Sequence, residues 1–143
     1  MLDYRTLKPQ SQRSILVASK DPGMRMLMTR LLNASNCTIL EASTAEEAAK
    51  AVASNEHLDL AFSDIDSVED KGIGILEQFK NYQPNTPVVF LSGNYEIDEY
   101  LSAMDEGAFD YLPKPVQVGD LFRVIDRAFS EEELGRQLEF ATI

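Results

Sequence analysis

Five short apolar runs, each followed by a stretch with helical spacing, constrain the fold of this chain more than any other feature. The clearest run is Pro-Val-Val-Phe-Leu at 87–91, and the others cover residues 15–18, 38–40, 58–62 and 109–112. Such short, almost wholly apolar runs are typical of strands buried on both faces, as in parallel sheets covered by helices. The sequence therefore predicts an α/β fold with a five-stranded, doubly wound parallel sheet and helices on both faces.

The stretches between these runs carry apolar stripes at helical spacing, which normally face the core. The stripes comprise Met24, Leu27, Met28, Leu31 and Leu32; Ala45, Ala48, Ala49 and Val52; Ile75, Leu76 and Phe79; Ile97, Leu101 and Met104; and Val118, Leu121, Phe122, Ile125 and Phe129. Asp21 before Pro22 is a typical helix start, and Thr44-Ala-Glu-Glu47 is a capping box. Gly107 fits the C-terminal cap of the fourth helix.

The length of 143 residues fits one domain. We expect a polar N-terminal arm over residues 1–13, the domain over 14–130 and a C-terminal helical tail over 131–143. Residues 130–133, Ser-Glu-Glu-Glu, match a second capping box. The tail therefore either extends the last helix or begins a new one.

Charge and composition exclude several classes of function. With Lys+Arg 13 against Asp+Glu 24, the net charge of −11 disfavours binding to nucleic acids and anionic membranes. Cys37 and His57 are each the only residue of their type, which excludes a disulfide framework and a Cys/His metal cluster. We expect a buried Cys37 and an ordinary loop position for His57. No apolar run approaches the ~18 residues of a membrane span, and no signal-peptide core is visible, so we expect a soluble, cytoplasmic protein.

Polar residues follow the runs at the edge where parallel sheets usually bind their ligands. These segments are Ser19-Lys20-Asp21, Ser63-Asp64-Ile65-Asp66, Ser92-Gly93-Asn94 and Lys114 between two prolines. A carboxylate, a hydroxyl and an ammonium at one edge suit phosphoryl chemistry. An aspartate there would attack phosphorus, while a serine and a lysine would hold the anionic oxygens.

Three of these segments resemble the receiver domain of two-component response regulators, over about residues 14–130. Asp59-Leu-Ala-Phe-Ser-Asp64, with Gly72 eight residues later, is similar to the strand and loop of the phosphoacceptor aspartate. Val88-Val-Phe-Leu-Ser92 is similar to the strand that ends in the switch Ser/Thr, and Tyr111-Leu-Pro-Lys114-Pro115 to the family's aromatic residue, lysine and proline. The resemblance implies a flavodoxin-like sheet of order 2-1-3-4-5 and a cis peptide bond at Lys114–Pro115.

The same resemblance implies a phosphorelay function. Asp64 would take a phosphoryl group from a phosphohistidine on a histidine kinase or phosphotransfer protein, and the chain would otherwise be no enzyme, at most dephosphorylating itself. Lys114 would offset negative charge, Ser92 would bind phosphoryl oxygens, and Tyr111 would turn inward behind Ser92 as a switch. The readout would be the surface of the fourth helix, fifth strand and fifth helix, offered to a downstream protein, an output domain or a second copy.

The sequence departs from the family where an acidic pair normally holds Mg²⁺. Ser19 and Lys20 occupy these positions, and Asp21 is better explained as a helix cap. Asp64 and Asp66 then remain as metal ligands, although Mg²⁺ usually takes one or two carboxylates along with waters. A lysine ammonium ~6 Å from Mg²⁺ would add roughly 5 kcal/mol of repulsion at an effective dielectric constant of ~20. The resemblance therefore implies Mg²⁺, whereas Ser19 and Lys20 disfavour it.

Two alternatives follow from this departure. Lys20 either turns outward into solvent or places its ammonium where the metal would lie, paired with Asp64. The chain is either a receiver phosphorylated on Asp64 or a phosphorylation-independent pseudo-receiver that acts as a protein-interaction module. Ser19 and Lys20 favour the second function, whereas the presence of Asp64, Ser92 and Lys114 favours the first. A flavodoxin-like cofactor binder is disfavoured because no flavin or dinucleotide loop is visible.

Overall fold

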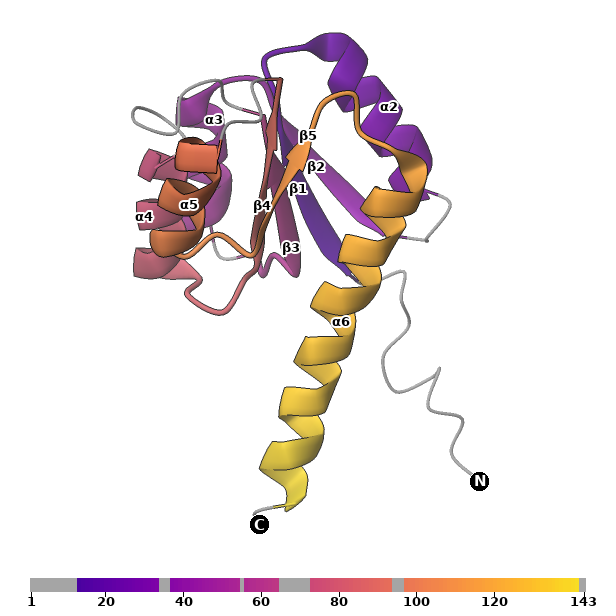
Figure 1. The fold of residues 1–143 in the computed structure, drawn as a ribbon. Helices are drawn as coiled ribbons and strands as arrows, with labels where there is room; N and C mark the ends of the chain where they lie inside the picture. The colour runs from indigo at the N-terminus through magenta and orange to yellow at the C-terminus, as the bar shows by residue number, and fades with distance from the viewer. Residues whose placement is uncertain (1–12, 34–36, 55, 65–72, 94–96, 142–143) are drawn as a thin grey trace.

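The computed structural model describes residues 13–33, 37–54, 56–64, 73–93 and 97–141, with only the backbone of residues 73 and 131–141. Five parallel strands form one sheet in the order β2-β1-β3-β4-β5 (Figure 1). The strands are β1 (Ser14–Ala18), β2 (Thr38–Ala42), β3 (Leu60–Ser63), β4 (Val88–Ser92) and β5 (Asp110–Pro113). The predicted fold class and strand order are confirmed, and the Lys114–Pro115 peptide bond is cis as expected.

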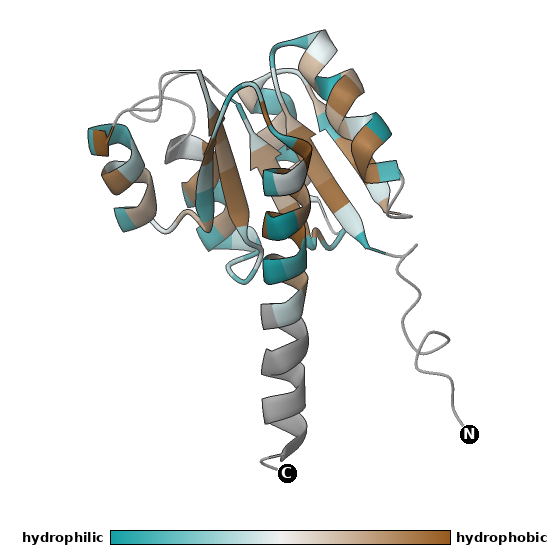
Figure 2. Ribbon diagram, turned by 45° about the vertical axis from the view of Figure 1, so that its right-hand side comes forward, coloured by the Kyte–Doolittle hydropathy of each residue, from teal (hydrophilic) through white to brown (hydrophobic). Residues whose placement is uncertain are grey.

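Five helices cover the two faces of this sheet. They are α2 (Pro22–Asn33), α3 (Ala45–Ala53), α4 (Ile73–Tyr82), α5 (Ile97–Asp105) and α6 (Val118–Ala141). Helices α2 and α6 lie on one face and α3, α4 and α5 on the other, so that the apolar strands are covered on both sides (Figure 2). Because side chains alternate along a strand, Leu16 of β1 joins the core under α3–α5 while Ile15 and Val17 join the core under α2 and α6.

The predicted caps at Asp21, Thr44 and Gly107 are confirmed, but the box at Thr44 is not closed as predicted, because the Glu47 carboxylate accepts from Ser43 rather than from the N–H of Thr44. Asp21 Oδ1 accepts a hydrogen bond from the backbone N–H of Gly23 at 2.9 Å, and Thr44 Oγ1 accepts one from Glu47 at 3.0 Å. After α5, Gly107 has a φ of 106°, a conformation that favours glycine. Its N–H donates to Met104 and that of Ala108 to Ala103, the pair of bonds that defines a Schellman cap.

The apolar stripe predicted for α5 is wrong at Ile97 and Leu101, whereas Met104 packs against the core as predicted. Ile97 is 72% and Leu101 57% exposed, whereas Ala103 is fully buried. Positions 101 and 103 lie about 200° apart around a helix, so a helix that packs through Ala103 turns Leu101 away from the core. Tyr100 and Met104 are partly buried and pack against the same core as Ala103. Leu27 of α2 and Val118 of α6, also predicted to face inward, are 44% and 49% exposed.

The predicted strand boundaries differ from the structure by one or two residues, and β3 is the clearest case. Strand β3 begins at Leu60 rather than Leu58, because the N–H of Leu58 donates to the Gln83 side chain and its carbonyl accepts from the Thr86 hydroxyl. Of the two alternatives for the C-terminal tail, the structure shows the first: α6 continues through residues 130–133 to Ala141, and the capping box there starts no new helix. The helix-favouring residues around Ser130 propagate α6 beyond the sheet (Figure 1). Within the described ranges, no helix, α6 included, combines the length and apolarity needed to span a membrane.

Candidate functional site

The strand register brings the predicted site residues to one edge of the sheet. Ala18 pairs with Ser63 and Ser92 with Pro113, so the residues after these strands emerge side by side. The N–H of Asp64 donates to the carbonyl of Ala18 at 2.9 Å. The N–H of Lys114 donates to the carbonyl of Ser92 at 2.8 Å. Four strands thus deliver Ser19, Asp64, Ser92 and Lys114 to a common edge.

Asp64 and Lys114 form an ion pair at this edge. Lys114 Nζ lies 2.7 Å from Asp64 Oδ2, and the Asp64 side chain is only 2% exposed. The other carboxylate oxygen, Oδ1, is buried and makes no hydrogen bond with the described part of the chain. A buried carboxylate needs a compensating charge, which Lys114 supplies through Oδ2. Oδ1 is therefore the carboxylate oxygen that has no hydrogen-bond partner among the described residues.

Ser92 and Tyr111 lie next to this pair on β4 and β5. Ser92 is half-buried at the end of β4, where its carbonyl receives the Lys114 N–H. Tyr111 is buried in the core, and its hydroxyl donates to Glu99 Oε2 of α5 at 2.9 Å. The Tyr111 ring also meets the Tyr100 ring edge-to-face, with centroids 6.1 Å apart. Tyr111 thus lies inward, and its role as a switch stays a prediction.

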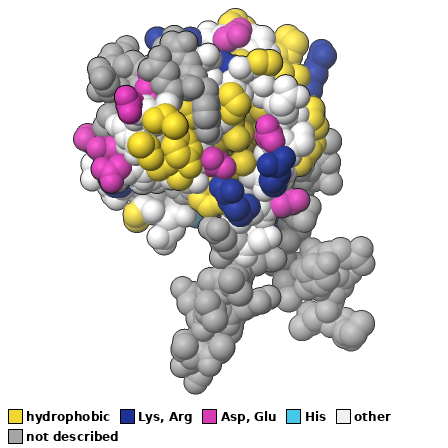
Figure 3. All heavy atoms as spheres, viewed as in Figure 1, with side chains coloured by type: hydrophobic (Ala, Val, Ile, Leu, Met, Phe, Trp, Pro, Cys, Tyr) yellow, Lys and Arg dark blue, Asp and Glu magenta, His cyan; other side chains and the backbone are white. Residues whose placement is uncertain are grey.

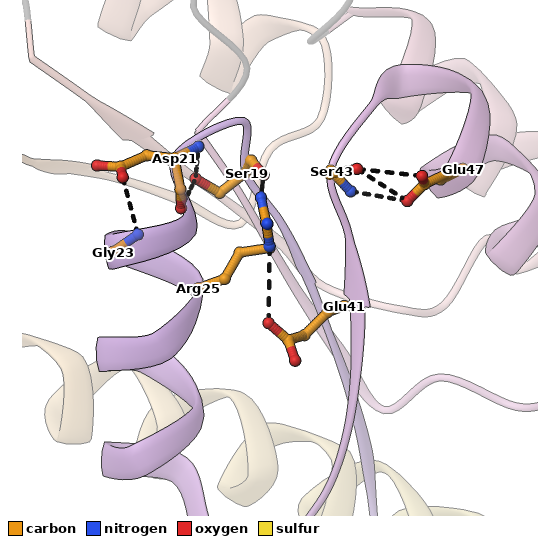
Figure 4. A network of polar contacts seen from close by, with 7 residues as sticks. All are labelled: Ser19, Asp21, Gly23, Arg25, Glu41, Ser43 and Glu47. Carbon is orange, nitrogen blue, oxygen red and sulfur yellow. Dashed lines mark hydrogen bonds and ion pairs between the residues drawn. The ribbon is translucent and has the colours of Figure 1, made fainter.

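The polar atoms of Ser19 are occupied by local contacts (Figure 4). Its N–H donates to the carbonyl of Ala42 at 2.9 Å, and its hydroxyl lies 3.1 Å from the N–H and 3.4 Å from the carbonyl oxygen of Asp21. Arg25 Nη1 donates to the Ser19 carbonyl at 2.6 Å, while Arg25 Nε lies 3.6 Å from Glu41. The buried Ser19 is therefore part of the turn that links β1 to α2.

Lys20 and Asp21 form no ion pair or hydrogen bond with Asp64 among the interactions of the described residues. Lys20 is exposed and forms no ion pair with any residue that the structure describes. This position agrees with the first alternative, in which Lys20 turns into solvent, and not with a lysine in the metal's place. The Asp21 carboxylate is exposed and caps α2 through Gly23, as the sequence predicts.

The described residues do not fit a carboxylate-based Mg²⁺ site. Asp64 Oδ1 offers one buried, unbonded acceptor, but no group of three metal-ligating side chains occurs among the residues described. The Ser19 hydroxyl and the Asp21 carboxylate are both used within the β1–α2 turn. Asp66, the other predicted ligand, lies outside the described residues. Since Mg²⁺ prefers several oxygen ligands in octahedral geometry, Asp64 alone is a poor site.

Sequence reasoning missed three polar contacts. Arg25 donates to Ser19, and Glu99 accepts from Tyr111. In the sequence Arg25 and Glu99 are ordinary charged helix residues, and nothing near them indicates a partner that lies outside their own helix. His57, expected to be an ordinary loop residue, places Nε2 3.2 Å from the buried Asp59 Oδ1. Cys37 is buried as expected, and burial raises the pKa of its thiol.

Comparison with known proteins identifies related chains. The family model described as "Response regulator receiver domain" matches residues 15–126. The DNA-binding transcriptional regulator NtrC of Salmonella typhimurium is 32% identical over 132 residues, which cover 90% of this chain and 28% of that protein. NtrC of Escherichia coli K12 is 32% identical over 88% of this chain and 27% of its own length. The chain thus spans little more than a quarter of these relatives.

Solved structures agree with these sequence matches. A response regulator receiver domain protein from Clostridium thermocellum superposes with a TM-score of 0.77 at 30% identity, covering 86% of this chain and 98% of that one. NtrX from Brucella abortus, solved in complex with ADP, has a TM-score of 0.77 at 28% identity, covering 90% of this chain and 28% of that one.

Proposed function

Because the chain belongs to the response regulator receiver domain family, we propose that it signals by accepting a phosphoryl group on Asp64. The observation that supports this proposal is the geometry at Asp64. Lys114 binds Oδ2 at 2.7 Å, while the buried Oδ1 makes no hydrogen bond with the described residues. One oxygen is thus held by a cation, and the other is engaged by no donor among the described residues, so it would act as the nucleophile once the donor's approach exposes it.

On the acceptor side, the proposed reaction uses only residues of this chain, and the phosphohistidine belongs to the partner protein. Asp64 Oδ1 attacks the phosphorus of a phosphohistidine, and the new O–P bond forms as the P–N bond breaks. The P–N electron pair returns to the imidazole nitrogen. Lys114 offsets the added negative charge, and the Ser92 hydroxyl donates to a phosphoryl oxygen. We assign no step to Mg²⁺, because the described residues do not fit it.

The partners follow from this chemistry. The donor is a histidine kinase or phosphotransfer protein, and the receiver acts in the cytoplasm and does no other chemistry beyond losing its own phosphoryl group to water. The readout surface comprises α5, β5 and the start of α6, where hydrophobic side chains gather beside Lys, Arg, Asp and Glu (Figure 3). Ile97, Leu101 and Val118 are the large apolar side chains exposed there.

This surface would contact a downstream protein, an output domain or a second copy of the chain. The relatives that the chain matches over about a quarter of their length are named as DNA-binding regulators. A DNA-binding output would thus come from a part of such a protein outside the matched segment. The net charge of −11 argues against direct nucleic-acid binding by this chain.

A second candidate function is a phosphorylation-independent interaction module. It is favoured by the β1–α2 turn, where Ser19 is fully engaged and Lys20 replaces an acid. In this case the Asp64–Lys114 ion pair serves only to hold β3 and β5 together. The surface of α5 and β5 would then be presented to its partner without modification.

Incubation with phosphoramidate, which carries the P–N bond of phosphohistidine, distinguishes the two functions. Intact mass spectrometry reads the product, with one sample in a chelator and one in Mg²⁺. The first function predicts an increase by one phosphoryl group in both samples and none in Asp64→Asn. An unchanged mass under both conditions would leave the second function. Circular dichroism of Asp64→Asn checks that the control variant is folded.

A further inference from the structure

A charged hydrogen bond joins helix α5 to strand β5. The Tyr111 hydroxyl donates to Glu99 Oε2 at 2.9 Å, and the Tyr111 side chain is only 2% exposed. Tyr100, the next residue along α5, packs edge-to-face on the same ring at 6.1 Å between centroids. Helix α5 thus holds Tyr111 through one polar and one aromatic contact from adjacent residues.

The carboxylate matters because Tyr111 is buried. A phenol hydroxyl removed from water needs a hydrogen-bond partner, and losing that partner costs the desolvation of the group. A bond to an ionised carboxylate is about twice as strong as a neutral one. The ring itself lies among apolar residues of the core, including Phe90 and Ala103. Glu99 therefore supplies a strong polar contact at one end of an apolar site.

The position of Glu99 links this contact to the exposed surface of α5. Glu99 lies in the first turn of the helix, whose outward side carries Ile97 and Leu101 at 72% and 57% exposure. Two residues beyond Tyr111 on β5, Pro113 pairs with Ser92 of β4. The carbonyl of Ser92 accepts the N–H of Lys114. A movement of Tyr111 would therefore act on α5 at its beginning, directly under these apolar side chains.

We propose that Glu99 is a positioning residue that holds Tyr111 in the core and so fixes the orientation of α5 against β5. When this bond is lost, Tyr111 leaves the core more often, and Ile97 and Leu101 change position. This inference deepens the proposed function, because it rests on Tyr111 as the switch and on α5 as part of the readout surface. The test of Glu99 requires no phosphorylation. Its failure can therefore be distinguished from a failure of the proposal that Asp64 is phosphorylated.

The environment of Tyr111 can be measured by ¹⁹F NMR of the full chain labelled with fluorotyrosine. Tyr111→Phe assigns the signal, and the chemical-shift difference between H₂O and D₂O reports ring exposure. We expect a small difference in the wild-type chain and, in Glu99→Ala, a shift towards the value of Tyr82, which is 58% exposed. Glu99→Gln keeps an acceptor oxygen and should stay close to the wild type. Asp98→Ala removes the neighbouring exposed acid and should change nothing.

Two results would overturn the proposal: an unchanged Tyr111 signal in Glu99→Ala, or an equal change in Asp98→Ala. If Glu99→Ala does not fold, Tyr111→Phe provides the test, because it removes the donor and keeps the ring. Amide hydrogen exchange in α5 after its first turn, where the N–H groups are bonded within the helix, should then accelerate about tenfold, as expected for loss of a charged hydrogen bond. Exchange in α3 should stay constant. No acceleration in α5 would contradict the positioning role.

Discussion

Lys114 Nζ lies 2.7 Å from Asp64 Oδ2, and the two partners of this ion pair differ strongly in burial. The Asp64 side chain is 2% exposed and that of Lys114 25%. The lysine can therefore regain water when it loses its partner, whereas the aspartate cannot. This asymmetry makes the two single substitutions unequal in their effect on stability.

Lys114→Ala should lower the free energy of unfolding by about 3 kcal/mol, because it leaves a buried carboxylate without a counter-charge. Asp64→Asn should cost clearly less, since the remaining ammonium is partly hydrated. Combining Asp64→Asn with Lys114→Ala should restore part of the loss. Urea denaturation at neutral pH measures all three variants. Equal losses in the two single variants would show that burial of Asp64 does not control the pair.

Restoring the family's acidic pair should create a Mg²⁺ site next to Asp64. In Ser19→Asp/Lys20→Asp a cation is removed and two carboxylates are added, so Mg²⁺ affinity should rise at least ~10-fold. Isothermal titration calorimetry measures the affinity. Ser102→Asp/Lys80→Asp makes the same charge change at exposed helix positions and should have little effect. Equal gains in both variants would mean that Ser19 and Lys20 do not lie at the metal position.

The C-terminal cap of α5 should depend on Gly107. Its φ of 106° strains any L side chain, so Gly107→Ala should destabilise the domain by about 1–2 kcal/mol, although the added methyl group meets only Lys80 Cε at 3.7 Å. Gly119→Ala is the matched control. Gly119 lies in α6 with nothing within 4 Å of the new Cβ, and the change should stabilise by about 0.5 kcal/mol. Thermal unfolding gives both values, and effects of the same sign would contradict this explanation.

Glu47 should make the stability of the domain depend on pH. The backbone N–H of Ser43, and then its hydroxyl, hold the pKa of the Glu47 carboxyl below its ordinary value of 4.5. A lowered pKa means that this contribution is present above pH 4.5 and is lost as the pH falls through the folded-state value. Glu47→Gln should therefore be less stable than the wild type at neutral pH, and the difference should disappear on acidification. Glu46→Gln, which removes an acid from the same helical turn, is the matched control, and an equal pH trend in both variants would contradict this explanation.

Local sequence patterns predicted the sheet because they reflect local physics. Ile15 and Leu16 of β1 point to opposite faces of the sheet, and each is buried in one of the two cores. A strand that is buried on both faces must be apolar throughout, so it can be predicted from its own sequence without knowledge of its neighbours. The same holds for the caps at Asp21 and Gly107, whose bonds span only a few residues. The strand-end residues then followed from the rule that parallel strands end at one edge.

The remaining features depend on contacts between distant elements. Helix α5 faces the sheet with the side that carries Ala103, which packs in the core. The apolar residues Ile97 and Leu101 predict the opposite side. Glu99 was not identified because its partner, Tyr111, lies 12 residues away on another element. The hydrogen bonds of the β1–α2 turn could not be predicted either, because the contact of Arg25 with the Ser19 carbonyl forms only in the folded chain.

The central claim is that Asp64 itself becomes phosphorylated without a divalent metal. After treatment with phosphoramidate in a chelator, reduction with borohydride converts an acyl phosphate to an alcohol, which changes an aspartate into homoserine. Peptide mass spectrometry then locates the modified residue. The account predicts homoserine at position 64 of the wild-type chain and no modified peptide in Asp64→Asn. Homoserine at another position, or none at all in the chelator, would contradict it.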